Sequence, residues 1–362
     1  MIELEGSALI VADFSISGGT REYFRYLISS LSGGKIYVAI PARAVNKDLE
    51  QFLNYKDVHV CKLRTFDIFF KIFFLRFIWE FFVISILKFK YRPNLIICST
   101  GNIKNWLYIF LQSTNHVHVL HSSPNSYGIY FKLYFTVIKL FSNSKKHVVI
   151  VVSNYAAKRL ARHLPFRILV VHNFSRILSP ILNHDKPHND MSVVSLGHVR
   201  EYKNPYVWVD VARQVVKEMD NVSFYWYGEG ELLYQMQCVT FGDNKIHFMD
   251  EVCDISSVLG QATVFFHPTK LENHSLSILE AMSFKIPCVV SHVGGNPESV
   301  VDGLTGFVYS PNDVQGFVSS ILLLLNDNML RDRMGLAGYD LVSSKFSLEI
   351  WENKFQKILD SL

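Results

Sequence analysis

The chain has 362 residues, 49% of them hydrophobic and 19% charged, which is the composition of a globular protein. A chain of this length is too long for one compact core, so we predict two domains. The net charge of +4 hides an asymmetry: residues 1–175 hold 22 Lys and Arg against 9 Asp and Glu, whereas residues 176–362 hold 14 against 23. A basic, Phe-rich half suits an anionic membrane surface, a phosphate-bearing substrate or nucleic acid, or reflects charge drift between two ordinary domains. No nucleic-acid-binding module accompanies it, so we expect no nucleic-acid partner.

The cysteines and the first residues of the chain indicate the cellular compartment of the protein. The five cysteines show no paired spacing, which predicts neither a disulfide framework nor a zinc site and favours a reducing cytoplasm. Residues 1–15 lack a basic segment followed by a long apolar run, so we interpret them as a first strand and not as a signal peptide.

The first half alternates short apolar runs with longer helical patterns. Helices are expected at 20–31 and before residue 95. The apolar runs predict buried parallel strands at 8–12, 36–40, 95–98, 117–120 and 148–152. Strands alternating with helices predict a doubly wound α/β domain.

Residues 66–87 are the best candidate for a membrane span. Four charged residues interrupt them: Asp67, Lys71, Arg76 and Glu80. Each charge near a bilayer centre costs about 2.5–3.5 kcal/mol on insertion scales, which argues strongly against a span. We predict a helix largely buried in the first domain, with partial docking onto a membrane surface as the alternative. Residues 127–147 repeat the aromatic and basic composition, which keeps peripheral membrane contact open.

The second half repeats the alternation. Helices are expected at 205–218 and 277–283, and strands at 193–196, 222–227, 246–248, 264–266 and 288–290. The polar, Pro-containing segment 179–190 is the expected linker. The prediction is therefore an α/β protein of two Rossmann-like domains facing each other across a cleft, at 1–178 and 190–345. In open α/β sheets, ligands bind at the carboxyl ends of the strands.

Residues 267–308 carry the strongest motif. A strand ends at Pro268, a loop carries Glu272, and a helix begins near Ser275 and Leu276. The free backbone N–H groups at that helix start suit a diphosphate. Glu280 lies about one turn inside, and its side chain leans towards the helix start, so it can reach a ribose. Glu272 can reach the sugar beyond the diphosphate. Two glutamates at this spacing also occur in ordinary helices as a cap and a buried residue.

The surroundings of the two glutamates narrow the choice. They are followed by Ala-Met, an apolar strand and then Gly294, Gly295, Glu298, Gly303 and Gly306. This block closely resembles the donor site of the family-four glycosyltransferases, which have the GT-B fold, in a variant common among bacterial polysaccharide-building members. The resemblance implies that Glu280 holds the nucleotide ribose and that Glu272 contacts the donor sugar. Asn273, His274 and Ser275 replace the family's Gly-Phe-Gly, which leaves the backbone contact in place and puts the sugar's identity in doubt.

A second block, 195–204, places cations at the same edge. A strand runs into Gly197 and then a loop, and positive charge is needed where a nucleoside diphosphate leaves. The family pattern is Gly-Arg followed five residues later by Lys. Lys203 matches that Lys, His198 occupies the Arg position, and Arg200 lies two residues on. The resemblance implies that Lys203 and Arg200 bind the diphosphate, whereas His198 is either a neutral packing residue or a replacement ligand.

Other candidate residues lie in or near the first domain. Gly18 and Gly19 follow the first strand and allow close backbone approach to a phosphate or sugar, although an ordinary turn is equally consistent. The resemblance places His121 in the donor-sugar pocket, and it matches Asn173 to the Asn of the family's Val-Ser, helix, Val-Ile-x-Asn segment. His116 and His118 lie on one strand face as ordinary alternation puts them, so we predict no metal site.

Residues 346–362 carry Trp351 and Phe355 one helical turn apart and resemble the terminal helix that returns to the first domain in GT-B proteins. The resemblance as a whole implies a retaining glycosyltransferase. It would use a UDP- or GDP-sugar as donor substrate, need no cofactor or metal ion, and act by same-face attack as the diphosphate departs.

The expected acceptor is a lipid-linked saccharide of cell-surface polysaccharide biosynthesis, such as O-antigen, lipopolysaccharide or capsule. The expected location is the cytoplasm, peripheral on the inner face of a bacterial plasma membrane. Two alternatives stay open: a nucleotide-sugar 2-epimerase of GT-B fold, and an inactive partner subunit that binds a sugar nucleotide or a lipid.

Overall fold

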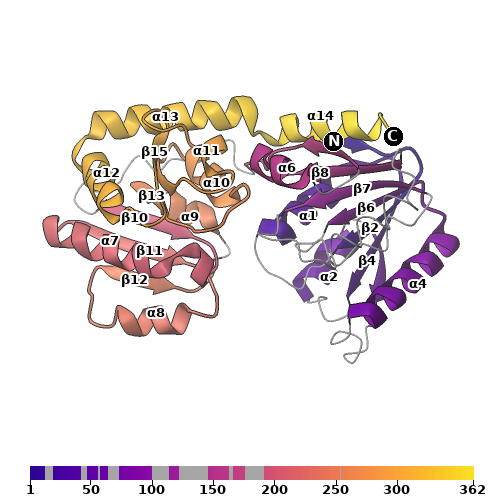
Figure 1. Ribbon diagram of the computed structural model, residues 1–362, viewed down its shortest axis with the longest axis horizontal. Coiled ribbons are helices and arrows are strands. Elements are labelled where there is room, and N and C mark those ends of the chain that lie inside the picture. The colour runs from indigo at the N-terminus through magenta and orange to yellow at the C-terminus, as the bar shows by residue number, and fades with distance from the viewer. Residues whose placement is uncertain are drawn as a thin grey trace. The chain divides into compact units, whose positions relative to one another are not determined.

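The computed structural model describes residues 1–12, 19–41, 47–55, 58–63, 73–99, 114–121, 146–162, 166–175, 191–252 and 254–362. The chain divides into two compact units (Figure 1). Unit 1 comprises Met1–His172 together with Trp351–Leu362, and unit 2 comprises Asn173–Ile350. The expected linker at 179–190 lies wholly outside the described residues.

Unit 1 is built on a seven-stranded parallel sheet in the order β5-β4-β2-β6-β7-β8-β9. In chain order the strands are β2 (Ser7–Ala12), β4 (Lys35–Pro41), β5 (His59–Leu63), β6 (Leu95–Ser99), β7 (Asn115–Leu120), β8 (His147–Val151) and β9 (Arg167–Val170). A short pair, β1 (Ile2–Glu3) and β3 (Leu31–Ser32), lies apart from it. The five predicted strands are present, whereas β5 and β9 were not predicted because their short runs include charged residues.

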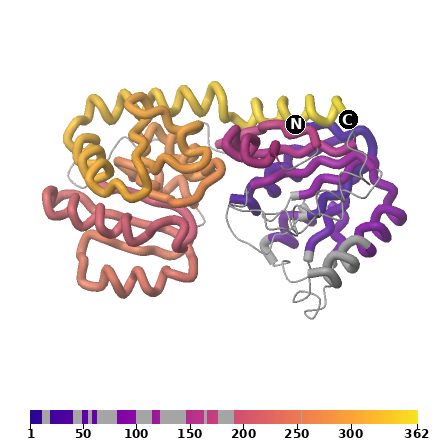
Figure 2. The backbone as a smooth tube through the Cα atoms, viewed as in Figure 1, coloured from indigo at the N-terminus to yellow at the C-terminus, as the bar shows by residue number. Residues whose placement is uncertain are grey.

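Helices surround this sheet, and one of them comes from beyond unit 2 in the sequence. They are α1 (Gly19–Ser30), α2 (Lys47–Tyr55), α4 (Phe73–Tyr91), α6 (Asn154–Leu160) and α14 (Leu348–Leu359), the last belonging to unit 1 from Trp351 on. The buried Trp351 donates its indole N–H to the Tyr23 hydroxyl of α1 at 3.1 Å. The amino group of Met1 pairs with Glu352 at 2.8 Å, so the first residues and α14 run side by side (Figure 2).

The second half of α4 differs from the prediction of a largely buried helix. Phe82, Ile86 and Phe89 expose 58%, 49% and 81% of their surface, and they follow the i, i+4, i+7 spacing of one helix face. Ile84 is buried and packs into the core of unit 1. No helix of the described residues is long and apolar enough to cross a membrane.

Unit 2 contains a six-stranded parallel sheet in the order β12-β11-β10-β13-β14-β15. Its strands are β10 (Met191–Leu196), β11 (Val222–Tyr227), β12 (Ile246–Met249), β13 (Val264–His267), β14 (Cys288–Ser291) and β15 (Gly306–Tyr309). All but β15 were predicted. The parallel sheets in two units confirm the predicted α/β class.

Helices cover both faces of this sheet. They are α7 (Pro205–Glu218), α8 (Leu233–Val239), α9 (Ile255–Leu259), α10 (Leu276–Ser283), α11 (Asn296–Ser299), α12 (Val314–Asn326) and α13 (Asn328–Lys345). Alternate strand residues enter two separate cores. Trp208 of α7 and Phe266 share one core with α12, whereas Phe265 and Val290 share the other with α10. This layering leaves the carboxyl ends of β10 and β13, which pair directly, free to carry loops.

Candidate active site

Two loops of unit 2 leave neighbouring strands at the same edge of its sheet. The loop after β10 passes Gly197 and forms a short 3-10 helix, η5 (Glu201–Lys203), before α7 begins. The loop after β13 runs from His267 to Ser275, where α10 begins. Because β10 and β13 are parallel neighbours, both loops start at the carboxyl edge of the sheet, where α/β folds bind ligands.

Three side chains meet between these loops. The Lys203 ammonium is 2.7 Å from Oε2 of Glu272, and Nε2 of His267 is 3.2 Å from the same oxygen. Nζ of Lys203 and Nε2 of His267 are 3.5 Å apart. The second carboxylate oxygen, Oε1, accepts the backbone N–H of Asn273 at 3.2 Å. Only 17% of the Glu272 side chain is exposed, so this carboxylate is held almost entirely by protein groups.

Burial and charge set the protonation states of this cluster. Burial on its own would raise the pKa of the Glu272 carboxyl, but the charge of Lys203 and the hydrogen bond from His267 hold that pKa well below its usual value. Burial, helped by the charge of Lys203, lowers the pKa of His267. Near neutral pH the cluster is therefore an ammonium, a carboxylate and a neutral imidazole.

Backbone contacts hold the two loops against each other. Asn204 has a left-handed backbone, with φ of 64°, and its buried side-chain amide donates to the carbonyls of Pro268 and Pro311 at 3.1 and 2.9 Å. The Tyr202 carbonyl accepts both the Lys270 N–H at 2.7 Å and the Thr269 hydroxyl at 2.9 Å. These bonds fix the separation at which Lys203 and Glu272 meet.

Two glycines with positive φ lie at this edge, and one of them, Gly294, permits a close approach of backbone. Gly294 has φ of +59°, and a Cβ added there would overlap the carbonyl oxygen of Glu272. Gly197 has φ of +127°, and a Cβ there would touch the Lys203 stem at 4.0 Å. A side chain at either position would be strained by its backbone conformation, and at 294 it would also displace the Glu272 loop.

The start of α10 lies where the sequence predicted it. Ser275 is the N-cap residue, and its hydroxyl pairs with the Ser277 hydroxyl at 2.9 Å instead of capping a backbone N–H. Leu276 is the first helical residue. Glu280 is buried, with 4% of its surface exposed, on the same helix. Backbone N–H groups in the first turn of α10 have no acceptor within the helix.

Asn173 supports the segment before α10 from the start of unit 2. Its side-chain amide donates to the His274 carbonyl at 2.6 Å. The buried His274 ring meets the Ser299 hydroxyl at 3.2 Å and packs against Phe346 at 5.2 Å. Asn173 and His274 therefore act within the protein as supports of the loop that carries Glu272.

Arg200 and His198 lie on the other loop, between Gly197 and Lys203. Arg200 is half-buried and precedes η5 in an extended conformation. Among the described residues, its side chain has no ion pair, and its Nε is buried without a hydrogen-bond partner. His198 is also half-buried. Arg200 is thus the second cation of this loop, and unlike Lys203 it is not neutralised by a carboxylate of the described residues.

Of the residues predicted for the first domain, His121 and Gly19 belong to unit 1, whereas Asn173 is the first residue of unit 2. His121 directly follows β7, and its ring packs edge-on against Tyr23 at 4.4 Å between centroids. Burial lowers the pKa of His121 to about 3, so it is neutral. Gly19 begins α1, and Gly18 lies outside the described residues.

His116 and His118 of β7 stack with His147 of β8 in the interior of unit 1. The ring of His116 lies 5.8 Å from that of His118 and 4.8 Å from that of His147, with interplanar angles of 11° and 18°. Parallel stacked rings do not direct their nitrogens at one point. Across the described part of the chain, no group of three His, Cys, Asp or Glu could hold a metal ion.

His267 is the site residue that sequence reasoning missed. The strand was predicted to end at Phe266, one residue before His267, and β13 in fact includes His267 as its last residue. The rule that functional side chains follow the carboxyl ends of parallel strands would have selected it.

Comparisons with known proteins find glycosyltransferases among the relatives of this chain. Residues 182–341 match the family described as glycosyl transferases group 1. An uncharacterized glycosyltransferase of Methanocaldococcus jannaschii is 26% identical over 275 residues, which cover 73% of this chain and 72% of that protein. The UDP-Gal:alpha-D-GlcNAc-diphosphoundecaprenol alpha-1,3-galactosyltransferase of Escherichia coli is 27% identical over 148 residues. That alignment covers 39% of this chain and 38% of the Escherichia coli protein.

The fold has solved counterparts. HepE of Anabaena, whose crystal structure is in complex with UDP-glucose, superposes with a TM-score of 0.78 at 16% identity. The match covers 98% of this chain and 100% of that one. The predicted two-domain α/β architecture of the GT-B type is thereby confirmed at the level of the fold.

Proposed function

We propose that the chain is a retaining, metal-independent glycosyltransferase, because residues 182–341 match the glycosyl transferases group 1 family and the chain has the GT-B fold. It moves a sugar from a UDP- or GDP-sugar to a lipid-linked glycan acceptor in the biosynthesis of cell-surface polysaccharide such as O-antigen or capsule. The observation that carries this proposal is the meeting of Lys203 and Glu272 beside the start of α10, at the carboxyl ends of β10 and β13.

The donor's groups are assigned by chemistry. Lys203, Arg200 and the free N–H groups at the start of α10 bind the diphosphate, because cations and helix N-termini stabilise phosphate oxygens. Glu280, on α10, accepts hydrogen bonds from the ribose hydroxyls. Glu272 contacts the sugar, and the Asn273–Ser275 backbone beside it completes the donor contact.

The proposed reaction is the one that the family resemblance implies. The acceptor oxygen bonds to the anomeric carbon on the face from which the diphosphate leaves, as the bond from that carbon to the diphosphate oxygen breaks. The acceptor proton passes to the departing phosphate oxygen, so no protein base is required. Lys203, Arg200 and the α10 start stabilise the negative charge that develops on the leaving group.

A lipid-linked acceptor is supported by two observations. The Escherichia coli relative is named for an acceptor with a diphosphoundecaprenol lipid. On α4, Phe82 and Phe89 are exposed and the last turn carries the cations Lys88 and Lys90, a combination of residue types that suits anionic lipid. We propose that this face of α4 rests on the inner face of a bacterial plasma membrane.

Donor screening tests the function. Purified protein is mixed with UDP- and GDP-sugars and a lipid-diphosphate saccharide, and nucleoside diphosphate release is measured with and without EDTA. We expect release that needs the lipid acceptor and survives EDTA. Conversion of the donor sugar to its 2-epimer would favour the epimerase instead, and binding without release from any donor would indicate an inactive subunit. The anomeric configuration of the product, read by NMR, tests retention.

A further inference from the structure

Two anionic groups compete for the Lys203 ammonium: the Glu272 carboxylate and the diphosphate of the donor. Nζ of Lys203 lies 2.7 Å from Oε2 of Glu272, and the proposed function gives the same ammonium to a diphosphate. A diphosphate that reaches Nζ meets a carboxylate of like charge, and like charges at short range repel strongly where water is largely excluded. Only 12% of the Lys203 side chain and 17% of the Glu272 side chain are exposed. An approaching diphosphate therefore weakens the Lys203–Glu272 pair and favours its separation.

Separation leaves a poorly hydrated carboxylate that needs other donors. An unpaired charge in such a position is costly, so a second partner must already be in place. Nε2 of His267 is 3.2 Å from the oxygen that Lys203 contacts, and the Asn273 N–H is 3.2 Å from the other oxygen. The His267 imidazole and the Asn273 N–H are both neutral donors. Each can stay on Glu272 when the diphosphate binds to Lys203.

His267 suits this role by its placement. It is the last residue of β13, 4% exposed, and its ring stacks on that of Phe265 at 6.0 Å. The imidazole is thus fixed by a central strand of the sheet, whereas Lys203 reaches the cluster through a long flexible stem. When Lys203 moves, His267 stays.

We propose that His267 is a positioning residue that holds the Glu272 carboxylate while Lys203 passes from Glu272 to the diphosphate of the donor. The proposal rests on the proposed function of the site. It implies that Glu272 has two effects: it opposes binding of the bare diphosphate by occupying Lys203, and it is needed for sugar transfer. His267 reduces the opposition of Glu272 to diphosphate binding and keeps Glu272 in position for sugar transfer.

The experiment measures UDP and GDP affinity by calorimetry, and turnover with the active donor, in single and double variants. His267→Leu should weaken binding of the preferred nucleoside diphosphate at least about tenfold, the worth of one hydrogen bond to a charged group, and should lower kcat. His267→Gln, whose amide can donate to Glu272, should restore most of both. Glu272→Gln should bind the nucleoside diphosphate more tightly, by about three- to tenfold, while losing turnover.

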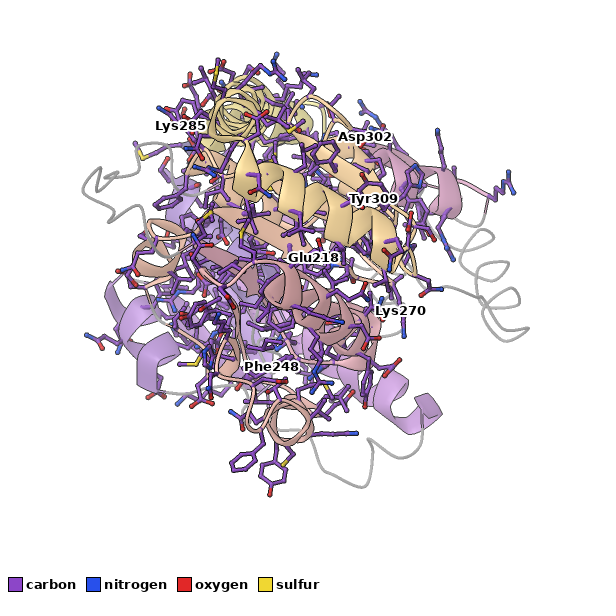
Figure 3. The ribbon with its side chains drawn as sticks, turned by 90° about the vertical axis from the view of Figure 1, so that its left-hand side faces the viewer. Glu218, Phe248, Lys270, Lys285, Asp302 and Tyr309 are labelled. Atoms are coloured by element: carbon purple, nitrogen blue, oxygen red, sulfur yellow. The ribbon has the colours of Figure 1, made fainter. Side chains whose placement is uncertain are left out.

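The double variant separates positioning from packing. In the Glu272→Gln background, His267→Leu should change nucleoside diphosphate affinity little, because no carboxylate remains to be held. The control is Glu201→Gln, which removes the Glu201–Lys270 ion pair, also 2.7 Å long and joining the same two loops, but at the surface (Figure 3 labels Lys270). It should leave affinity and turnover unchanged.

The failures are distinguishable. Wild-type protein that binds neither UDP nor GDP would remove the proposed function itself. Two results would overturn the role of His267 alone, provided that the wild type binds a nucleoside diphosphate. One is an unchanged affinity in His267→Leu. The other is a loss of affinity on His267→Leu that is equally large in the Glu272→Gln background. Looser binding in Glu272→Gln would also overturn it. Thermal unfolding midpoints identify any variant that is only misfolded.

Discussion

Glu272 and Glu280 have different environments although eight positions separate them in the sequence. Glu272 is ion-paired between two loops, whereas Glu280 is buried on α10, the helix that follows the loop after β13. The sequence argument assigned the sugar to the first and the ribose to the second. Glu272 lies on a loop, where its hydrogen-bond partners can exchange. Glu280 lies on a helix, which holds it in place.

Replacing Glu280 tests the ribose role. Glu280→Gln keeps the size of the side chain and removes the charge that accepts from two hydroxyls, so turnover should fall about 10- to 100-fold with a raised KM for the donor. The measurement is steady-state nucleoside diphosphate release. Glu218→Gln, at the exposed end of α7, is the control (Glu218 is labelled in Figure 3). Near wild-type activity of Glu280→Gln would refute the assignment.

Gly294 tests how far the backbone positions the site. Gly294→Ala should lower the free energy of unfolding by about 1–3 kcal/mol and weaken nucleoside diphosphate binding, because its Cβ would push on the Glu272 carbonyl. Gly303→Ala is the matched control: its φ is +72°, close to the +59° of Gly294, but nothing lies within 4 Å of the added Cβ. Denaturant unfolding and calorimetry measure both variants. Equal effects on nucleotide binding would contradict a special role for the Gly294 contact.

At the scale of elements, α4 carries the membrane hypothesis. Phe82→Ser with Phe89→Ser should reduce partitioning onto anionic vesicles at least about tenfold, because each exposed Phe loses apolar area that lipid would cover. Co-sedimentation with phosphatidylglycerol vesicles measures the loss. Phe241→Ser in unit 2 removes a ring that is more exposed than either, at 92%, and should leave vesicle binding unchanged. Wild-type protein that stays in the supernatant would end the proposal.

The elements also show what the sequence could predict. Long apolar runs identified five strands in each unit, and the Pro205 start of α7 was predicted to the residue. Short strands such as β9 and β15 were missed, because four residues with a charge or a glycine carry little periodic signal.

The candidate site could be predicted only in part, because its contacts are distant in sequence. Lys203 and Glu272 were each selected by motif, but their ion pair joins residues 69 positions apart and depends on β10 lying beside β13. Strand order is set by packing of the whole sheet and not by any local pattern. The partnership with His267 therefore required the structure.

At the scale of the molecule, the buried histidines of unit 1 should make the stability of that unit sensitive to acid. Burial lowers the pKa of His116 and His118 in unit 1 well below the usual value, and lowers that of His147 to about 4. Each of these histidines is protonated more readily in the unfolded chain than in the folded one. Its contribution to the free energy of unfolding is therefore present above about pH 6.5 and is lost as the pH falls below that value. The expected loss is about 1.4 kcal/mol per pH unit for each fully buried histidine.

Hydrogen exchange at pH 7.5 and 5.5 checks this expectation strand by strand. Amides of β7 and β8 should lose protection at pH 5.5 by more than intrinsic exchange chemistry explains. His118→Leu should remove about one proton from the pH dependence of unfolding. A pH dependence identical to that of the wild type would show that His118 does not contribute.

The return of Trp351–Leu362 to unit 1 has a consequence for biosynthesis. Tyr23 receives its hydrogen bond from Trp351, 328 residues later, so a ribosome must translate all of unit 2 before unit 1 can be completed. Domains commonly fold in order as they emerge, but here the unit that emerges first is finished after the second. In the interval, nascent unit 1 exposes the apolar surface that Trp351 and Phe355 later cover, which makes it a client for chaperones that bind nascent chains.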